Sequence, residues 1–144
     1  MILYHGTASP YLPSIREFGL NPSEASKYTF RLETADGKAN PYTQHAVYLT
    51  TSLDTAKTFA ELRAEYVRAQ PGEHIADAYN GFFWKDEAAP DALPDAQPVV
   101  LELDVPEDIA KKLHADEAAS ERFEAFWYKG VIPATAIKEI FTAA

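Results

Sequence analysis

Short apolar runs alternate with longer polar stretches along the chain, and this pattern predicts the strands of a small sheet. Residues Ile2–His5 have the β-branched and aromatic content of a short buried strand. Residues Ala46–Thr50 form a second apolar run, and Val99–Val105 alternate apolar with acidic residues, as a strand with one solvated face does. Residues Phe123–Tyr128 predict a fourth strand. A last strand is expected around Ile137, Ile140 and Phe141.

Helix signals lie between these predicted strands. Prolines at the start and a glycine at the end predict a helix over residues 10–19. A second helix is expected to begin with a capping box at Thr51 and to run to about Gln70, where a Pro-Gly pair ends it. A short helix is expected over 106–113, and the polar residues 21–45 predict a long loop. Residues 73–97 predict a second long excursion, with an aromatic cluster at 82–84 and an acidic stretch rich in Ala and Pro. The pattern as a whole predicts an α+β fold with a mainly antiparallel sheet and a few helices.

Composition narrows the class of protein. The chain has 144 residues, of which 47% are hydrophobic and 24% charged, values typical of a single folded domain spanning 1–144. It has no cysteine, which excludes a disulfide scaffold, a thiol nucleophile and a thiolate metal site. No apolar run approaches the roughly 20 residues of a membrane-spanning helix, and the N-terminus lacks the pattern of a signal peptide. A cytoplasmic protein without a membrane partner is therefore expected.

The formal net charge is −9, and the excess of acidic residues lies in the second half of the chain. Such a chain has no general electrostatic attraction for nucleic acid, because that attraction depends on Lys and Arg side chains that neutralise phosphates. A nucleic-acid partner would require a local basic patch. The candidates in the charge-balanced first half are Arg16, Lys27, Arg31 and Lys38.

The most suggestive candidate for chemistry is the tripeptide His5-Gly6-Thr7. A strand that turns into a loop can expose an imidazole, and a glycine lets the backbone approach a ligand closely. Taken alone, the tripeptide fits better an ordinary strand-end histidine that packs or hydrogen-bonds locally. The other histidines, His45, His74 and His114, have no partners at metal-ligand spacing, so no metal site is expected. Phosphate-loop and nucleophile-elbow motifs are absent from the sequence, which excludes those enzyme classes.

Further fragments give the tripeptide a context. The chain contains L-Y-H-G-T at 3–7, G-L-x-P at 19–22, V-Y-L-T-T at 47–51 and G-x-I-P at 130–133. In this order, and over nearly the whole chain, they resemble the ADP-ribosyltransferase superfamily. The resemblance is strongest to the branch of diphtheria-toxin-type enzymes and poly(ADP-ribose) polymerases, whose motif residues are His, Tyr and Glu. It implies a single ADP-ribosyltransferase-like domain with a split antiparallel sheet and an NAD cleft between the two halves.

The resemblance also implies roles for individual residues. His5 would hydrogen-bond the adenosine ribose of NAD, the Gly6 backbone would hold the nicotinamide carboxamide, and the Thr7 hydroxyl would support that turn. Tyr48 would stack on the nicotinamide ring, although a tyrosine in a sheet also commonly fills core. The implied activity is NAD-dependent mono-ADP-ribosyl transfer to a macromolecular acceptor, protein or nucleic acid, as in a toxin or phage effector.

The third motif residue, a glutamate, departs from the family pattern. A carboxylate is needed because cleavage of the nicotinamide–ribose bond passes through an oxocarbenium-like state. Counting back from Gly130 places it at Ala125, whereas Glu124 is one residue away and would point to the opposite face of a regular strand. A bulge could re-aim Glu124, which is our assignment. Alternatively, Glu121 serves, or the site lacks the carboxylate.

Two alternative functions remain open from the sequence. An RNA 2′-phosphotransferase of the same superfamily resembles the chain again at Val99–Asp104 and at Trp127, but it has a histidine in the place of Tyr48 and an arginine-rich site. A catalytically inactive module of the same fold that binds NAD or ADP-ribose is the other, suggested by the displaced glutamate.

Overall fold

The computed structural model describes residues 1–22, 47–75, 83–85, 87, 89–115 and 125–142. Its strands are β1 (Ile2–Ala8), β2 (Val47–Thr50), β3 (His74–Ile75), β4 (Phe83–Trp84), β5 (Pro98–Asp104), β6 (His114–Ala115), β7 (Ala125–Tyr128) and β8 (Ile137–Thr142). Its helices are the 3-10 turn η1 (Ser9–Tyr11), α1 (Leu12–Phe18), α3 (Leu53–Arg68), α4 (Glu107–Ala110) and the 3-10 turn η3 (Ala134–Ala136).

The fold is α+β, as the hydrophobic pattern predicts. Six strands form one antiparallel sheet in the order β6-β7-β2-β1-β5-β8, and β3 pairs with β4 in a separate two-stranded sheet. Two of these features differ from the prediction: β3 and β4 lie within the expected loop 73–97, and β6 lies where no strand was expected. Strands of two residues are too short for an alternating pattern to indicate them.

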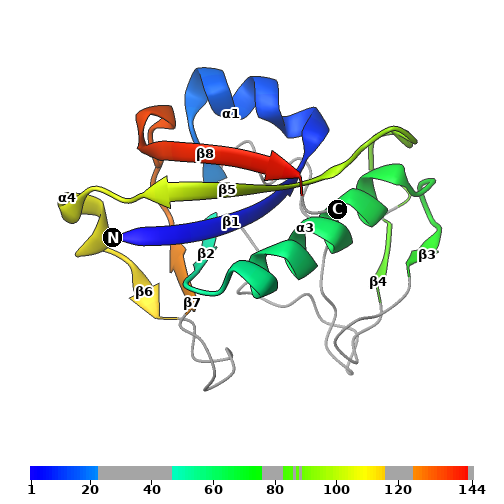
Figure 1. Ribbon diagram of the computed structural model, residues 1–144. Coiled ribbons are helices and arrows are strands. Elements are labelled where there is room, and N and C mark those ends of the chain that lie inside the picture. The colour runs from blue at the N-terminus through cyan, green and yellow to red at the C-terminus, as the bar shows by residue number, and fades with distance from the viewer. Residues whose placement is uncertain (23–46, 76–82, 86, 88, 116–124, 143–144) are drawn as a thin grey trace.

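The six-stranded sheet is split between β1 and β2. Strand β1 pairs with β5 along its whole length, from Ile2 opposite Asp104 to Ala8 opposite Pro98. Its register with β2 comprises a single position, Tyr4 opposite Thr50. Figure 1 shows β1, β5 and β8 running side by side, with β2 and β7 steeply inclined to them. The sheet therefore consists of two halves, β6-β7-β2 and β1-β5-β8, joined at one position.

Side chains on the two faces of the sheet pack against different helices. On one face Leu3, Leu49 and Leu101 form the main core with Ile15 of α1 and with Ile132. On the other face Ala56 and Ala60 of α3 pack against Val100, with Tyr4 and Phe141 at the side. The two helices lie on opposite sides of β1 and β5 in Figure 1. This arrangement buries both faces of the β1-β5 half.

Two of the glycine-containing motifs contact each other in the fold. Gly19 caps α1 with φ of 75°, so the predicted helix stop is confirmed. A Cβ at Gly19 would lie 2.3 Å from the carbonyl oxygen of Ile132, so the contact also requires glycine. The next residue, Leu20, exchanges backbone hydrogen bonds of 2.8 and 3.0 Å with Ile132. The segments 19–22 and 130–133 are thus joined through Leu20 and Ile132, which both belong to the main core.

The N-terminus of α3 corrects the predicted cap. The cap is Ser52, not Thr51: the Ser52 hydroxyl accepts from the backbone N–H of Thr55 at 3.1 Å. The hydroxyl of Thr50, the last residue of β2, accepts from the Ser52 N–H at 3.0 Å. Strand β2 therefore ends in a turn that shifts the start of the helix by one residue.

We expect Ser52→Ala to lower the free energy of unfolding by about 1 kcal/mol, because the first turn of α3 loses its acceptor. Thr51→Ala is the matched control and should cause a smaller loss, since Thr51 is exposed and the N–H of Thr55 donates to Ser52 instead. Urea unfolding of both variants measures the difference. Equal losses in the two variants would contradict the assignment of the cap.

Candidate active site at the split of the sheet

His5 bridges the two halves of the sheet. It lies in the middle of β1, half-buried, and its Nδ1 is 2.7 Å from the backbone carbonyl oxygen of Tyr48 on β2. A carbonyl oxygen only accepts hydrogen bonds, so Nδ1 carries the hydrogen and donates it. The imidazole thus joins β1 to β2 by a hydrogen bond beyond Tyr4 and Thr50, the only positions at which the two strands pair.

Burial sets the charge of this imidazole. It lowers the pKa of His5 from 6.5 to about 4; the hydrogen bond to Tyr48 opposes the shift, and the positive charge of Arg63 adds to it. His5 is therefore neutral at pH 7. With the hydrogen on Nδ1, its Nε2 has a lone pair and acts as an acceptor toward a hydroxyl or N–H group.

Tyr48 and Gly6 meet at the same split. Continuing the register from Tyr4 opposite Thr50 places Gly6 opposite Tyr48, beyond the last paired position. The neighbours of Tyr48 in β2, Val47 and Leu49, both belong to the main core, so strand alternation puts the Tyr48 side chain on the opposite face. This side chain is half-buried and its hydroxyl is buried. The structure therefore brings the His5 imidazole to the backbone carbonyl of Tyr48. Alternation along β1 from Leu3, a main-core residue, puts the His5 side chain on the core face, whereas the Tyr48 side chain lies on the opposite face.

Gly6 has a packing role that is independent of any ligand. A Cβ at this position would lie 2.2 Å from the carbonyl oxygen of Ala56 and 2.7 Å from the backbone nitrogen of Ala60. Helix α3 thus rests directly on the backbone of β1. The next residue, Thr7, is buried at 4% exposure and lies opposite Val99. The predicted turn from strand to loop after His5 is therefore wrong, because pairing with β5 continues the strand to Ala8.

The predicted carboxylates Glu124 and Glu121 both lie outside the described residues. The neighbouring position Ala125 is described: it begins β7 and lies opposite Thr50. Phe126 and Tyr128 pack against the main core, so alternation puts Ala125 on the other face, the face of Tyr48. The position that counting from the late motif assigns to the glutamate therefore does face the side of Tyr48, but an alanine occupies it.

An aromatic pair next to Tyr48 is not indicated by the sequence pattern. Trp127 of β7 lies opposite Tyr48, and on its other side it lies opposite His114 of β6. The rings of His114 and Trp127 stack with centroids 4.1 Å apart and planes 12° apart, and the Lys129 ammonium is 5.4 Å from the centroid of Trp127. In the sequence, His114 stands out only as a residue without partners at metal-ligand spacing. Only the strand pairing of β6 with β7 indicates the stack.

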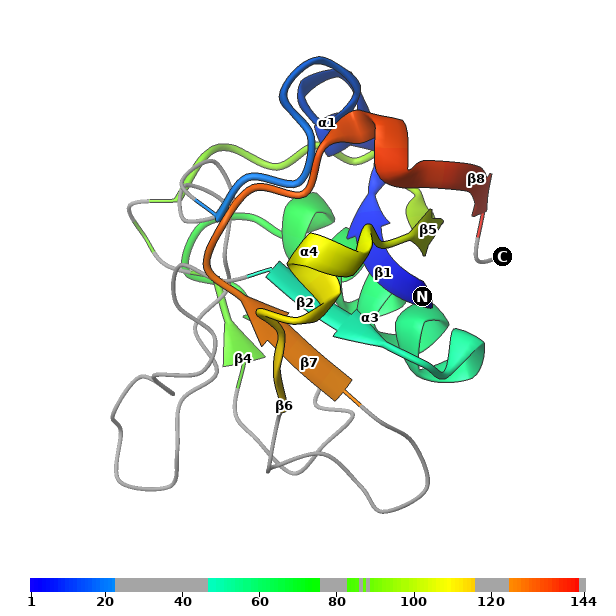
Figure 2. The same ribbon diagram turned by 90° about the vertical axis from the view of Figure 1, so that its left-hand side faces the viewer.

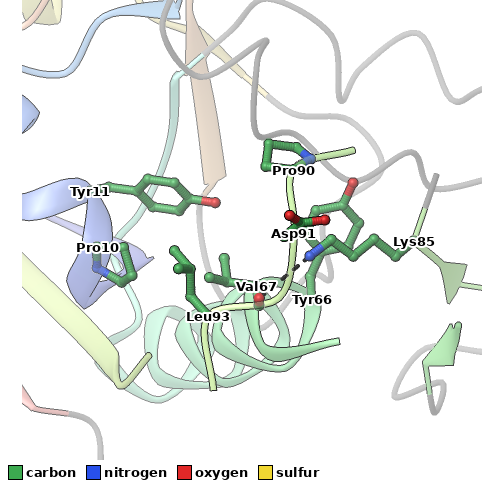
Figure 3. A pocket seen from close by; sticks show the side chains of 8 residues that line it. All are labelled: Pro10, Tyr11, Tyr66, Val67, Lys85, Pro90, Asp91 and Leu93. Atoms are coloured by element: carbon green, nitrogen blue, oxygen red, sulfur yellow. Dashed lines mark hydrogen bonds between the residues drawn. The ribbon is translucent and has the colours of Figure 1, made fainter. Parts of the chain in front are cut away.

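A cavity of about 120 Å³ has a lining that includes none of His5, Gly6 and Tyr48 (Figure 3). It is lined by Pro10, Tyr11, Tyr66, Val67, Lys85, Pro90, Asp91 and Leu93. Lys85 is only 2% exposed, and its Nζ donates to the carbonyl oxygens of Ala69 at 2.8 Å and Val67 at 3.4 Å. Burial lowers the pKa of Lys85, while Asp91 and then Glu73 oppose the shift. Because these carbonyls end α3, the lysine stabilises the C-terminus of the helix.

Two other classes of feature are absent from the described parts of the chain. No group of three or more His, Cys, Asp or Glu residues there could hold a metal ion. No helix among those residues has the length and apolar character needed to cross a membrane. Comparison of the chain with models of protein families, and with curated proteins, finds no match.

Proposed function

We propose that this protein is an NAD-dependent mono-ADP-ribosyltransferase whose site lies at the split of the sheet. The observation that carries the proposal is the neutral His5, which donates through Nδ1 to the Tyr48 carbonyl and so leaves Nε2 as an acceptor at the split. The resemblance to the ADP-ribosyltransferase superfamily implies both this histidine and a split sheet, and the two features occur here at one place.

The residues at the split fit the parts of NAD. A ribose hydroxyl is a donor for Nε2 of His5. A carboxamide has one N–H side and one C=O side, like a peptide group, so it can pair with the edge of β1 at Gly6 where β1 and β2 diverge. The Tyr48 ring, on the same side of β2 as Trp127, offers an aromatic face to the nicotinamide.

In the proposed reaction the bond between ribose C1′ and the nicotinamide nitrogen breaks, and its electron pair stays on the nicotinamide. A nucleophilic O or N atom of the acceptor forms the new bond to C1′ and loses its proton. Positive charge develops on the ribose, so a carboxylate near it lowers the barrier. We assign this role to Glu124, with Glu121 as the alternative.

Release of nicotinamide from NAD tests the proposal. We expect Glu124→Gln to lower the rate by a factor on the order of 10²–10³, because one charge-stabilising contact is lost in the transition state. Glu139→Gln, the same change at an exposed position of β8, is the control and should match wild type. A loss in Glu121→Gln instead of Glu124→Gln would move the assignment.

Two outcomes would contradict the proposal. Saturable NAD binding without nicotinamide release, in the presence and absence of a cell lysate, would indicate an inactive binding module. Removal of the 2′-phosphate from a spliced RNA junction would indicate the phosphotransferase.

A further inference from the structure

The β6–β7 pair carries an exposed platform of one aromatic pair and two lysines, which we call the His114 platform and define as Lys112, His114, Trp127 and Lys129. Strand β6 is the edge strand of the sheet, and Figure 2 shows it beside β7, far from β8. His114 is exposed, whereas Trp127 is half-buried. The tryptophan ring therefore covers one face of the imidazole, and the rest of the exposed His114 side chain is accessible.

The two lysines lie at one end of this platform. Lys112 precedes His114 by two residues and Lys129 follows Trp127 by two, and in an antiparallel pair these positions are at the same end. Both are exposed, and neither forms an ion pair within the described parts of the chain. Lys111 does not belong to the platform, because its ammonium is 3.7 Å from the Glu107 carboxylate. In an otherwise acidic half of the chain, Lys129 beside the stacked rings and Lys112 two residues before His114 form a local basic site that no described acidic residue pairs with.

The platform adjoins the proposed active site. Residues opposite each other in antiparallel strands have side chains on the same face, so Tyr48, Trp127 and His114 form one row across β2, β7 and β6. Two strand spacings, about 10 Å, separate the ends of this row. A molecule held on His114 would therefore present a neighbouring group to the reacting centre beside Tyr48.

We propose that the His114 platform binds the acceptor, and that the acceptor is single-stranded nucleic acid. The inference rests on the proposed function, since ADP-ribose would be transferred to the bound strand. An unpaired base stacks on the exposed face of His114, and the strand's phosphates contact Lys112 and Lys129 at the one end of the platform where both lysines lie. Aromatic faces combined with basic side chains are the means by which proteins bind single strands, because every base has a π-face and every nucleotide a phosphate. The net charge of −9 makes the binding weak and strongly dependent on salt.

Fluorescence anisotropy with a labelled single-stranded DNA or RNA of about 12 nucleotides, in the absence of NAD, tests the proposal. We expect His114→Ala to weaken binding about tenfold through loss of stacking. Lys112→Gln and Lys129→Gln should each reduce the slope of log K against log salt by about 0.7, the value for one phosphate contact to a single strand. A duplex of the same sequence should bind more weakly than the single strand, because its bases are already stacked.

Lys138→Gln is the matched control, since Lys138 is an exposed lysine on β8 at the opposite edge of the sheet. Equal effects of Lys138→Gln and Lys129→Gln, or a failure of the single strand to bind, would overturn the proposal. The proposal would also be overturned if labelled ADP-ribose were transferred in a lysate to proteins and to no nucleic acid. Strand binding is measured without NAD, so the two proposals can fail separately. If the wild-type protein binds the strand but releases no nicotinamide from NAD, the result counts against the proposed function and not against the His114 platform.

Discussion

Gly6→Ala is expected to lower the free energy of unfolding by at least about 3 kcal/mol, the upper end of the usual cost of overpacking. The added methyl would lie 2.2 Å from the carbonyl oxygen of Ala56 and 2.7 Å from the nitrogen of Ala60. Both are backbone atoms of α3, so no side-chain rotation relieves the clash. The helix itself must move away from β1, and its contacts with Val100 loosen. Urea or thermal unfolding measures the loss.

Gly130→Ala is the control for this prediction. Its added methyl would lie 2.6 to 2.8 Å from the hydroxyl oxygen and two ring carbons of Tyr128, so one side chain, and not a helix backbone, must shift. We expect a smaller loss than that of Gly6→Ala. A Gly6→Ala protein with wild-type stability and no NAD turnover would show that the glycine serves only the ligand and that α3 does not require it.

His5→Asn is expected to lower nicotinamide release by a factor on the order of 10²–10³ while the protein stays folded. The asparagine amide nitrogen takes the position of Nδ1 and can donate to the Tyr48 carbonyl, but nothing replaces Nε2 as an acceptor. The variant therefore separates the contact that joins the two halves of the sheet from the contact that the proposed chemistry uses. His5→Ala removes both and is the comparison. Full activity in His5→Asn would contradict the role of Nε2.

The same variant makes a prediction about pH. The pKa of His5 is about 4 in the folded protein and 6.5 in the unfolded chain, so the unfolded chain binds the proton more readily between these values. His5 therefore costs no stability above pH 6.5, and its cost grows as the pH falls to about 4, reaching about 3 kcal/mol. His5→Asn lacks this cost. The difference in unfolding free energy between the two proteins, measured from pH 7 to 4, should change by that amount; parallel curves would contradict it.

Much of the secondary structure follows from the sequence because its signals are local. Apolar runs indicated β1, β2 and β5, and Gly19 ends α1 where its freedom to adopt positive φ predicted. The start of α3 shows the limit of such signals. Thr50, Thr51 and Ser52 all carry a hydroxyl that can cap a helix, and only the position at which β2 ends selects Ser52.

By itself, then, the sequence determined that His5, Gly6 and Tyr48 stand in short segments that resemble a family pattern, because residue types and their order are sequence properties. Only the tertiary structure decided that β1 and β2 part beyond Tyr4 and Thr50, that the His5 imidazole spans this split, and that α3 requires Gly6. It also decided that Trp127 stacks on His114 beside Tyr48. These relations join residues far apart in the chain through strand register and helix packing. The pattern of any single segment carries no information about them.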